Sequence, residues 1–393
     1  MSLMRRTYRY RIYPTRRQAR ELDKQLGEAC DLYNAALQHR RDLWREHHQS
    51  VSFYDQDREL KDLRAAGLID PTVSFCSQRA TLRRLDRAFA AFYRRCKTGD
   101  KPGFPRFRSR RRFDTLEWPI GDGAALTDAG RLRLQNVGHV KVKLHRPIPA
   151  SAKPCTAQVT RRPGGRWFAS ISLDNVPANP LPSTGETVGI DLGISTFAAL
   201  STGELIDGPR AERTAAAKVR RAARRVARRR RGSQRRRRAV GLLARAREHE
   251  RQVRRDHAHK LSRELVERFD VIAVENLNVQ GLAKSALARD VNDQGWSQFV
   301  ILLGDKAEDA GRQVVPVDAR QTSQECSACG AIVTKTLSQR VHRCECGYHA
   351  DRDVNAARVI LSRALRAQTT GPDGAVDRQR WGDESRAVDR AAA

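Results

Sequence analysis

The chain has 393 residues, and its 75 Lys and Arg against 45 Asp and Glu give a formal net charge of +30. Such a charge favours a polyanionic partner, which inside a cell is most often nucleic acid. The longest apolar run, FVILLG at 299–304, is too short to cross a bilayer, and no apolar leader segment is recognisable. We therefore expect a cytoplasmic protein of about two to four structural units with no membrane partner.

A β domain is predicted from two separate segments near the start. RRTYRYRIYP (5–14) alternates apolar and basic residues, as a strand with one basic face does. Alternation returns over 131–175. The positions expected to face inward are Tyr8, Tyr10, Ile12, Leu132, Leu134, Val140, Val142, Leu144, Trp167, Ala169, Ile171 and Leu173. We expect residues 1–15 and 98–180 to form one β domain.

A helical insert separates the two β segments. Thr15 and Gln18 form a predicted capping box at the start of a helix. Apolar residues then recur at helical spacing in two sets, Leu22, Leu26, Ala29, Tyr33 and Leu37, followed by Leu82, Leu85, Phe89 and Phe92. Each set predicts a helix with one buried stripe, so residues 16–97 are expected to form a helical domain.

The segment KPGFPRFRSRRRF (101–113) sets arginines beside three phenylalanines, Phe104, Phe107 and Phe113. Its proline and glycine residues disfavour regular structure. Arginines can bind phosphates while aromatic rings stack on bases, which is typical of a loop that contacts nucleic acid. The alternative, in which the rings only anchor a basic loop to the core, is equally compatible with the sequence.

Short strands and helices are predicted to alternate after a proline-containing linker. TVGIDLGISTFAALSTGE (187–204) has the pattern of a two-stranded hairpin. Further apolar strands are predicted at 270–277 and 313–319, around a helix at 296–312. This alternation predicts an α/β domain over residues 181–321.

A strongly basic helical hairpin is expected inside this domain, at 209–268. Residues 210–238 contain fifteen Lys and Arg and a single acid, Glu212, with a break at Gly232 and Ser233. Such a charge run is either a solvated arm or a surface for a nucleic acid duplex. We favour the second interpretation because the duplex backbone is an extended polyanion.

Four of the eight cysteines are clustered with C-x2-C and C-x-C spacing: Cys326, Cys329, Cys344 and Cys346. This spacing is typical of a zinc ribbon, in which four thiolates hold a structural Zn²⁺ and leave no position for catalysis. His342 or His349 would be the alternative ligands. Residues 322–350 are expected to form this inserted ribbon. The other cysteines, Cys30, Cys76, Cys96 and Cys155, are predicted to be small buried side chains.

Three acids stand at the ends of predicted elements. Asp191 and Glu275 each end an apolar strand, and Asp353 lies in the first turn of a helix. Each alone has an ordinary interpretation as a turn, surface or helix-dipole residue. If they meet at one edge of a sheet, they repel one another unless cations neutralise them, and Mg²⁺ prefers such oxygen ligands. A pair of Mg²⁺ ions there could support phosphodiester hydrolysis.

Asp351 competes with Asp353 for the third position. Asp353 directly precedes Val-Asn-Ala-Ala, whose alanines allow a helix over 351–368 to pack closely on a sheet. Asp351 would instead assist from behind or pair with Arg352. Beyond this helix, residues 369–393 are polar and without period, so they are expected to be disordered.

These segments resemble the TnpB family of transposon-encoded RNA-guided nucleases, relatives of the type V CRISPR effectors. The segments similar to its RuvC-like motifs and its zinc insertion, in order and spacing, are VGIDLGI (188–194), IAVENL (272–277), TSQECSACG (322–330) and DRDVNAA (351–357). RYRIYPT and GFPRFRSR (103–110) are also similar to the family. The resemblance extends over nearly the whole chain.

The resemblance implies an RNase H-like (RuvC) nuclease domain with the inserted zinc ribbon, and a β-barrel-like wedge domain carrying the helical recognition insert. It implies Asp191, Glu275 and Asp353 as the catalytic ligands of two Mg²⁺ ions. It also implies two partners, a guide RNA from the transposon end and double-stranded target DNA, in a prokaryotic, nucleoid-associated setting. Because all three acidic positions are filled, a nuclease-dead relative is disfavoured.

Two other functions remain open from the sequence. A regulator could bind nucleic acid and act by occupancy without cutting it. A transposase could use the same metal site for DNA strand transfer. The residues do not indicate an oligomeric state.

Overall fold

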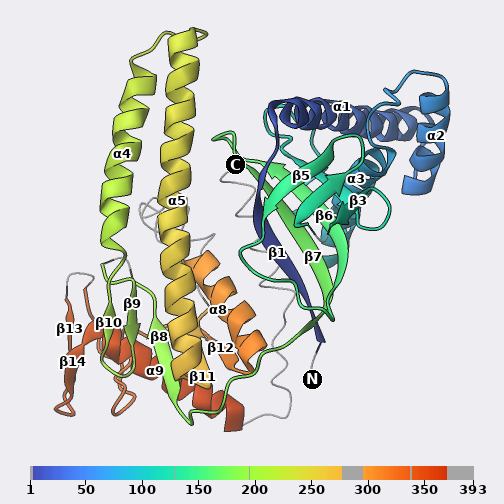
Figure 1. The fold of residues 1–393 in the computed structure, drawn as a ribbon. Helices are drawn as coiled ribbons and strands as arrows, with labels where there is room; N and C mark the ends of the chain where they lie inside the picture. Colours follow the sequence, from blue (N-terminus) through green and yellow to red (C-terminus); the bar gives the residue numbers. More distant parts are fainter. Residues whose placement is uncertain (1–2, 128, 194, 277–294, 337–338, 370–393) are drawn as a thin grey trace. The chain divides into compact units, whose positions relative to one another are not determined.

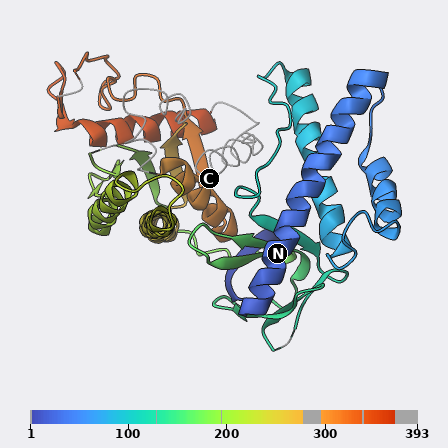
Figure 2. The same cartoon turned by 90° about the horizontal axis from the view of Figure 1, so that it is seen from above.

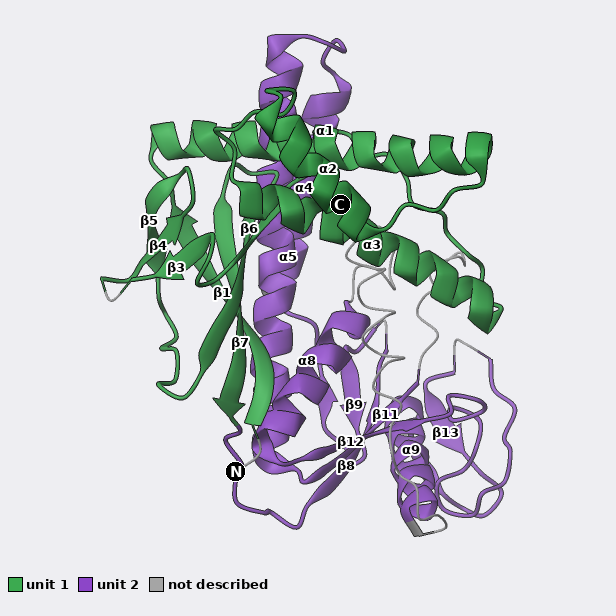
Figure 3. Ribbon diagram, turned by 90° about the vertical axis from the view of Figure 1, so that its right-hand side faces the viewer, with its two compact units in different colours: residues 1–177 green, residues 178–393 purple. Residues whose placement is uncertain are grey.

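The computed structural model describes residues 3–127, 129–193, 195–276, 295–336 and 339–369. The chain divides into two units, residues 1–177 and 178–393, each of which is described by itself (Figure 3). The predicted disordered tail lies almost wholly outside the described residues. Within the described part, no helix combines the length and the apolar character needed to span a bilayer.

The first unit is built on a seven-stranded antiparallel sheet in the order β2-β6-β7-β1-β5-β4-β3. Its strands are β1 (Leu3–Tyr13), β2 (Thr115–Pro119), β3 (Ala124–Leu126), β4 (Arg131–Leu134), β5 (Gly138–Lys143), β6 (Lys153–Arg161) and β7 (Trp167–Pro177). The opening strand β1 pairs with β5 and β7, as expected from the sequence. The edge strands β2 and β3 are joined by a short turn, so the sheet must curl until its edges approach each other.

Alternation in the sequence correctly predicts which strand residues face the core. Tyr8, Tyr10 and Ile12 are buried on one side of β1, and the later inward positions are buried as well. Leu144 is the exception, because β5 ends at Lys143 and leaves the Leu144 side chain exposed.

Three helices follow β1: α1 (Arg16–His47), α2 (Phe53–Ala65) and α3 (Phe75–Thr98) (Figure 1). Helices α1 and α3 contact β2, α2 packs on α3, and all three share the core with the sheet. The capping box of Thr15 and Gln18 is present at the start of α1. The predicted apolar stripes are buried except for Phe92, which is half-buried near the end of α3. Cys96, one turn later, is exposed, so its predicted burial was wrong; Cys155 is half-buried.

The second unit contains a five-stranded sheet in the order β10-β9-β8-β11-β12. Its strands are β8 (Thr187–Asp191), β9 (Ala198–Leu200), β10 (Leu205–Ile206), β11 (Val271–Glu275) and β12 (Gln313–Val317). Strands β8 and β9 form the predicted antiparallel hairpin. Strands β8, β11 and β12 run parallel, so their carboxyl ends meet at one edge.

Helices α5 (Gln234–Arg268), α8 (Trp296–Ala310) and α9 (Arg352–Thr369) cover the two faces of this sheet, and α4 (Arg210–Ala227) packs on α5. Side chains of α5 and α8, such as Leu265 and Phe299, pack with Val188 and Ile272 on one face. Ile360 of α9 packs on the opposite face. Helices α4 and α5 lie side by side and extend away from the sheet as the predicted hairpin (Figures 1 and 2).

The boundary between the two units, at Pro177 and Ala178, falls close to the predicted end of the β domain. The finer division into wedge, recognition, nuclease and zinc-ribbon domains stays a prediction. A small hairpin of β13 (Val341–Arg343) and β14 (His349–Asp351) directly precedes α9.

Candidate active site and metal centre

Two of the predicted acids lie side by side at the carboxyl edge of the second sheet. Asp191 ends β8, Glu275 ends β11, and the parallel register pairs Ile190 with Val274. The next step of this register sets the two acids opposite each other, with backbones roughly 4.8 Å apart. Asp191 and Glu275 are far apart in the sequence, but they are neighbours in the structure because β8 and β11 pair with each other.

Helix α9 brings the third predicted acid to the same edge. A Cβ built on Gly193, two residues after Asp191, would lie 4.0 Å from Asp353 Oδ2. The pKa of the Asp191 carboxyl is raised well above its ordinary value, first by burial and then by the negative charges of Glu275 and Asp353. Asp191, Glu275 and Asp353 therefore form one electrostatic cluster, which we call the acidic edge.

The close approach of α9 depends on small residues. A Cβ on Gly189 in β8 would lie 2.0 Å from the carbonyl oxygen of Ala357. Ala356 and Ala357 are fully buried at this contact, as the sequence predicted for the alanines. The role of Gly189 was missed, although a glycine inside an apolar strand is the usual sign of a close backbone approach.

Asp351 and Asp353 have different surroundings. Asp351 Oδ1 accepts hydrogen bonds from the backbone N–H groups of Asp353 (2.9 Å) and Val354 (3.2 Å), so it caps α9. The half-buried Asp353 carboxylate accepts instead from the guanidinium of Arg352 at 2.9 Å. Arg340 Nη1 lies 3.9 Å from its other oxygen. The sequence suggested Arg352 as a partner of Asp351, whereas the contacts above join Arg352 to Asp353 and make Asp351 the cap of the helix.

Glu275 is the most enclosed member of the acidic edge, with 7% of its surface exposed. Burial raises its pKa, while a hydrogen bond from the Thr322 hydroxyl and the positive charge of Arg363 act in the opposite direction. Carboxylates that share one environment offer only oxygen ligands, the kind that hard divalent cations prefer, and such a cation would relieve their repulsion.

The four clustered cysteines fit a closed metal site. Among the described residues, these four cysteines form a group of potential metal ligands, and their Sγ atoms all lie within 4.8 Å of one another. The Sγ atoms of Cys326 and Cys346 are 3.9 Å apart, and those of Cys329 and Cys344 are 3.5 Å apart. Tetrahedral Zn–S bonds of 2.3 Å would set sulfurs about 3.8 Å apart. The alternative ligands His342 and His349 are not needed.

Each cysteine pair is followed by a glycine in the left-handed region. Gly330 has φ 78° and Gly347 has φ 84°, which residues with a Cβ rarely adopt. The backbone N–H of Gly330 donates to Cys326 O and that of Gly347 to Cys344 O, closing two tight turns. The turns present the thiols to a common point.

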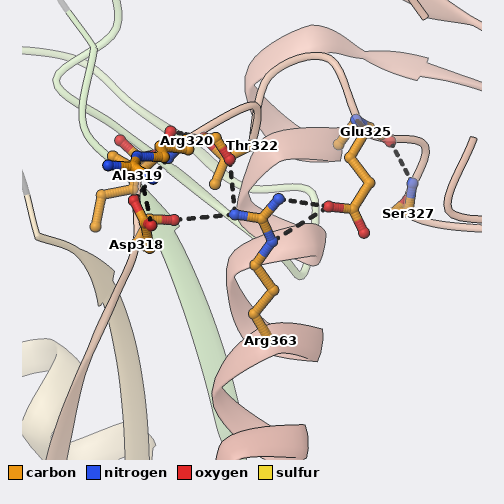
Figure 4. A network of polar contacts seen from close by, with 9 residues as sticks. Asp318, Ala319, Arg320, Thr322, Glu325, Ser327 and Arg363 are labelled. Atoms are coloured by element: carbon orange, nitrogen blue, oxygen red, sulfur yellow. Dashed lines mark hydrogen bonds and ion pairs between the residues drawn. The ribbon is translucent and has the colours of Figure 1, made fainter. Parts of the chain in front are cut away.

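Two polar residues of α9 that sequence reasoning missed hold the start of the cysteine motif. The fully buried Asn355 side chain donates to Glu325 O (2.7 Å) and accepts from the Ser327 N–H (3.0 Å). Arg363 donates to the Glu325 carboxylate and to backbone carbonyls of the preceding turn (Figure 4). In the sequence, Asn355 could have been noticed as a polar residue next to the alanines expected to pack on the sheet. Nothing in the sequence distinguished Arg363 from the other arginines.

The structure separates the rings of the 101–113 loop. Phe113 is buried in the core, whereas Phe104 and Phe107 are 45% and 47% exposed. Phe104 rests on Phe89, with ring centroids 5.5 Å apart, and the Arg41 guanidinium lies 5.2 Å from the Phe107 ring centre. The anchoring interpretation therefore holds for Phe113, while the other two rings keep a face available for stacking.

An ion pair joins the two helices of the basic hairpin: Glu212 of α4 lies 3.4 Å from Arg254 of α5. The buried Glu248 accepts from Gln252 of the same helix, α5, at 3.0 Å. Ser233 caps α5 beside the predicted break. Arg228–Arg231 at the turn are exposed, so this end of the hairpin presents concentrated positive charge.

Three family models match parts of the chain. A model described as "Probable transposase" (OrfB of IS605) matches residues 170–286, and one described as "Cas12f1-like, TNB domain" matches residues 296–360. A third, described as "Helix-turn-helix domain", matches residues 1–49. The described part of that last segment is one strand and one long helix, β1 and α1.

Known relatives match over most of the chain. "Putative RNA-guided DNA endonuclease" of Streptomyces pristinaespiralis is 34% identical over 378 residues, covering 94% of this chain and 92% of the relative. "Putative RNA-guided DNA endonuclease InsQ" of Escherichia coli (strain K12) is 27% identical over 300 residues, covering 72% of each. The solved "Cas12f1-sgRNA-target DNA complex" contains a chain similar in fold, with a TM-score of 0.59, 13% identity, and coverage of 91% of this chain and 98% of that chain.

The likeness to the chain of the solved complex defines the class by its fold, a multi-domain architecture shared with Cas12f1. Sequence identity to known relatives identifies the family within this class. The chain belongs to the TnpB family.

Proposed function

We propose that this protein is an RNA-guided DNA endonuclease of a transposon, which cleaves double-stranded DNA at the acidic edge. Family membership supports the activity. One observation carries the location: acids from three distant segments, at the ends of β8 and β11 and the start of α9, share one electrostatic environment. An isolated surface acid would not be surrounded by two others in this way.

Asp191, Glu275 and Asp353 would hold the catalytic Mg²⁺ ions. Bound magnesium would polarise the scissile phosphate and lower the pKa of an attacking water. The protein's own residues prepare the site: Glu275 is buried, loss of hydration raises the pKa of Asp191, and Arg352 and Arg340 bring positive charge beside Asp353. These arginines lower the electrostatic cost for a DNA phosphate that approaches three carboxylates.

The remaining parts of the proposal concern structure and partners. The four clustered cysteines would bind a structural Zn²⁺, and residues 322–350 would form a zinc ribbon. Residues 1–15 and 98–180 would act as a wedge domain around the recognition helices at 16–97. The α4–α5 hairpin and the exposed rings of Phe104 and Phe107 would contact nucleic acid through charge and stacking. The guide RNA would come from the transposon end, and the protein would work at the nucleoid.

Replacement of Asp191 by Asn tests the location of the chemistry. The protein, purified with the RNA that accompanies it, would be assayed for cleavage and binding of a DNA that matches the guide. We expect Asp191→Asn to lose cleavage by roughly 1,000-fold, since the metal that would stabilise the transition-state charge loses a charged ligand, while guide-dependent binding persists. Asp207→Asn, at an exposed acid after β10, is the matched control and should cleave normally.

The same assay separates the alternatives. A wild-type protein that binds its target without cutting would support action by occupancy. Joined products from transposon ends in the absence of guide RNA would support a transposase. Cleavage that survives Asp191→Asn would move the chemistry away from the acidic edge.

A further inference from the structure

We propose that Thr322 and Arg363 are positioning residues, which fix the carboxylate of Glu275 relative to Asp353 through the turn that begins the cysteine motif. The importance of Glu275 rests on the proposed function above. The contacts themselves form a continuous path from one acid, through Thr322 and Arg363, to the helix that bears the other.

The path begins at Glu275. The Thr322 hydroxyl, with 3% of the residue exposed, donates to Glu275 Oε1. The single proton of this hydroxyl can be donated to Glu275 Oε1 or to Ala319 O, 3.2 Å away, and the bond to Oε1 fixes the position of that carboxylate oxygen. Outer-shell hydrogen bonds of this kind hold ligating carboxylates in place in metal sites. Thr322 thus controls the rotation of Glu275.

The position of Thr322 is set by a turn between β12 and Cys326. Gln321, directly before Thr322, has φ 59°, a left-handed conformation that is unfavourable for a residue with a side chain. The backbone N–H groups of Gln324 and Glu325 both donate to Gln321 O at 2.9 Å. Such a conformation persists only where surrounding contacts hold it.

Arg363 supplies those contacts from α9. Its Nη1 donates to the carbonyl oxygens of Asp318 (3.0 Å) and Arg320 (2.8 Å), on the near side of the turn. Its Nε and Nη2 donate to Glu325 Oε2 at 3.2 and 2.6 Å, on the far side. Figure 4 shows the guanidinium between the two sides. The guanidinium of arginine holds acceptors on both sides in one fixed plane, whereas the ammonium of lysine is a compact group with no such fixed geometry.

The same helix carries Asp353. Ten residues separate Asp353 from Arg363, so the two are about 15 Å apart along one rigid element. Asn355 adds a second tie, through Glu325 O and Ser327 N. A shift of the turn would therefore move Glu275 relative to Asp353, and the spacing of two prospective metal ligands depends on a guanidinium outside the metal site.

A pair of Thr322 variants tests the first step. Thr322→Val keeps the shape and removes the hydroxyl, whereas Thr322→Ser keeps the hydroxyl. The readouts are Mn²⁺ affinity of the protein, titrated by electron paramagnetic resonance, and the single-turnover cleavage rate. We expect Thr322→Val to lower both by about 10-fold or more, on the scale of outer-shell losses, and Thr322→Ser to restore them. Wild-type Mn²⁺ affinity in Thr322→Val would overturn the proposal.

Arg363→Lys tests the second step. We expect a weaker Mn²⁺ affinity with one zinc per chain retained, because the four thiols are untouched. Arg358→Lys is the matched control: Arg358 also lies on α9 and donates to Ser201 O and the Tyr348 hydroxyl, away from the turn. Equal Mn²⁺ affinity in the two variants would contradict a positioning role for Arg363.

These measurements separate the inference from the proposed function. If the wild-type protein cleaves no guided target, the nuclease proposal fails, while the order of Mn²⁺ affinities still decides whether Thr322 and Arg363 position Glu275. If cleavage depends on Asp191 but Thr322→Val cleaves and binds Mn²⁺ like wild type, the nuclease proposal stands and the inference fails.

Discussion

Gly189 shows how a single residue can control the geometry of the acidic edge. Any side chain at this position would enter the backbone of α9, whose Ala357 oxygen lies 2.0 Å from the position of a Cβ. Helix α9 carries Asp353 and Arg363, so its distance from β8 also sets the distance of Asp353 from Asp191. The alanines at 356 and 357 complete the contact from the other side.

Gly189→Ala should therefore lower the stability of the protein. We expect a loss of about 1–3 kcal/mol, the usual cost of overpacking, and a drop in melting temperature of about 2–4 °C per kcal/mol in a domain of this size. Gly241→Ala is the control, because Gly241 lies in α5 with open space around it. That change should be neutral or raise stability by about 0.5–1 kcal/mol. Equal melting of Gly189→Ala and wild type would contradict the close contact.

Residues with an intrinsic chemical signature were the ones that sequence alone could place. Asp191 and Glu275 stand out because each ends an apolar strand, and the cysteines because of their spacing. Thr322 and Arg363 could not be found this way. Their roles depend on partners distant in the chain, and a threonine in a turn or an arginine on a helix has many ordinary explanations.

At the level of elements, periodicity predicted the strands and helices that bury one face. It failed where an element ends, because hydrophobic patterns do not mark termini: Leu144 lies just beyond β5 and Cys96 near the end of α3, and both side chains are exposed. The basic loop at 101–113 could not be resolved from sequence, since burial of a phenylalanine depends on which helices pass over it.

The cysteine motif is the element whose stability should depend on a metal. Replacing Cys326 and Cys329 by Ser should release zinc, from one ion per chain to none, and lower the melting temperature, because metal binding and folding of such turns are coupled. Zinc would be measured by atomic emission and melting by circular dichroism. Cys96→Ser, at an exposed cysteine of the other unit, should change neither quantity.

Chelation gives an independent test of the same element. Because Asn355 and Arg363 tie the start of the motif to α9, loss of zinc should also loosen the helix that carries Asp353. A chelator that removes zinc should therefore reduce both melting temperature and Mn²⁺ affinity. A protein that melts unchanged after chelation would contradict the coupling.

For the whole molecule, the net charge of +30 predicted a polyanionic partner but not the surface that binds it. The acidic edge is a local reversal of this charge. A basic surface attracts the nucleic acid backbone over long distances, and a small negative site requires cations before the same backbone can be cut. The two features are therefore complementary. In the described part of the chain, exposed cations are dense at the turn of the α4–α5 hairpin, where Arg228–Arg231 are all exposed.

If this hairpin binds phosphates, its arginines should govern the salt dependence of RNA affinity. Each lost phosphate contact should reduce the slope of log affinity against log salt by about 0.7 to 0.9. Changing all four residues of Arg228–Arg231 to Gln should therefore reduce the slope by about 1.5–3.5, if two to four of them make contacts. Affinity for the accompanying RNA would be measured by filter binding between low and moderate salt.

The charge-preserving variant, with Lys at the same four positions, separates electrostatics from a change in helix structure. A lysine keeps one positive charge near the phosphate, so the salt slope should stay close to that of wild type even if affinity falls slightly. Reduction of the slope by Gln but not by Lys would assign the contacts to Arg228–Arg231. Identical slopes for wild type and the Gln variant would mean that the hairpin turn is a solvated arm, and that the phosphate contacts are made by other basic surfaces of the protein.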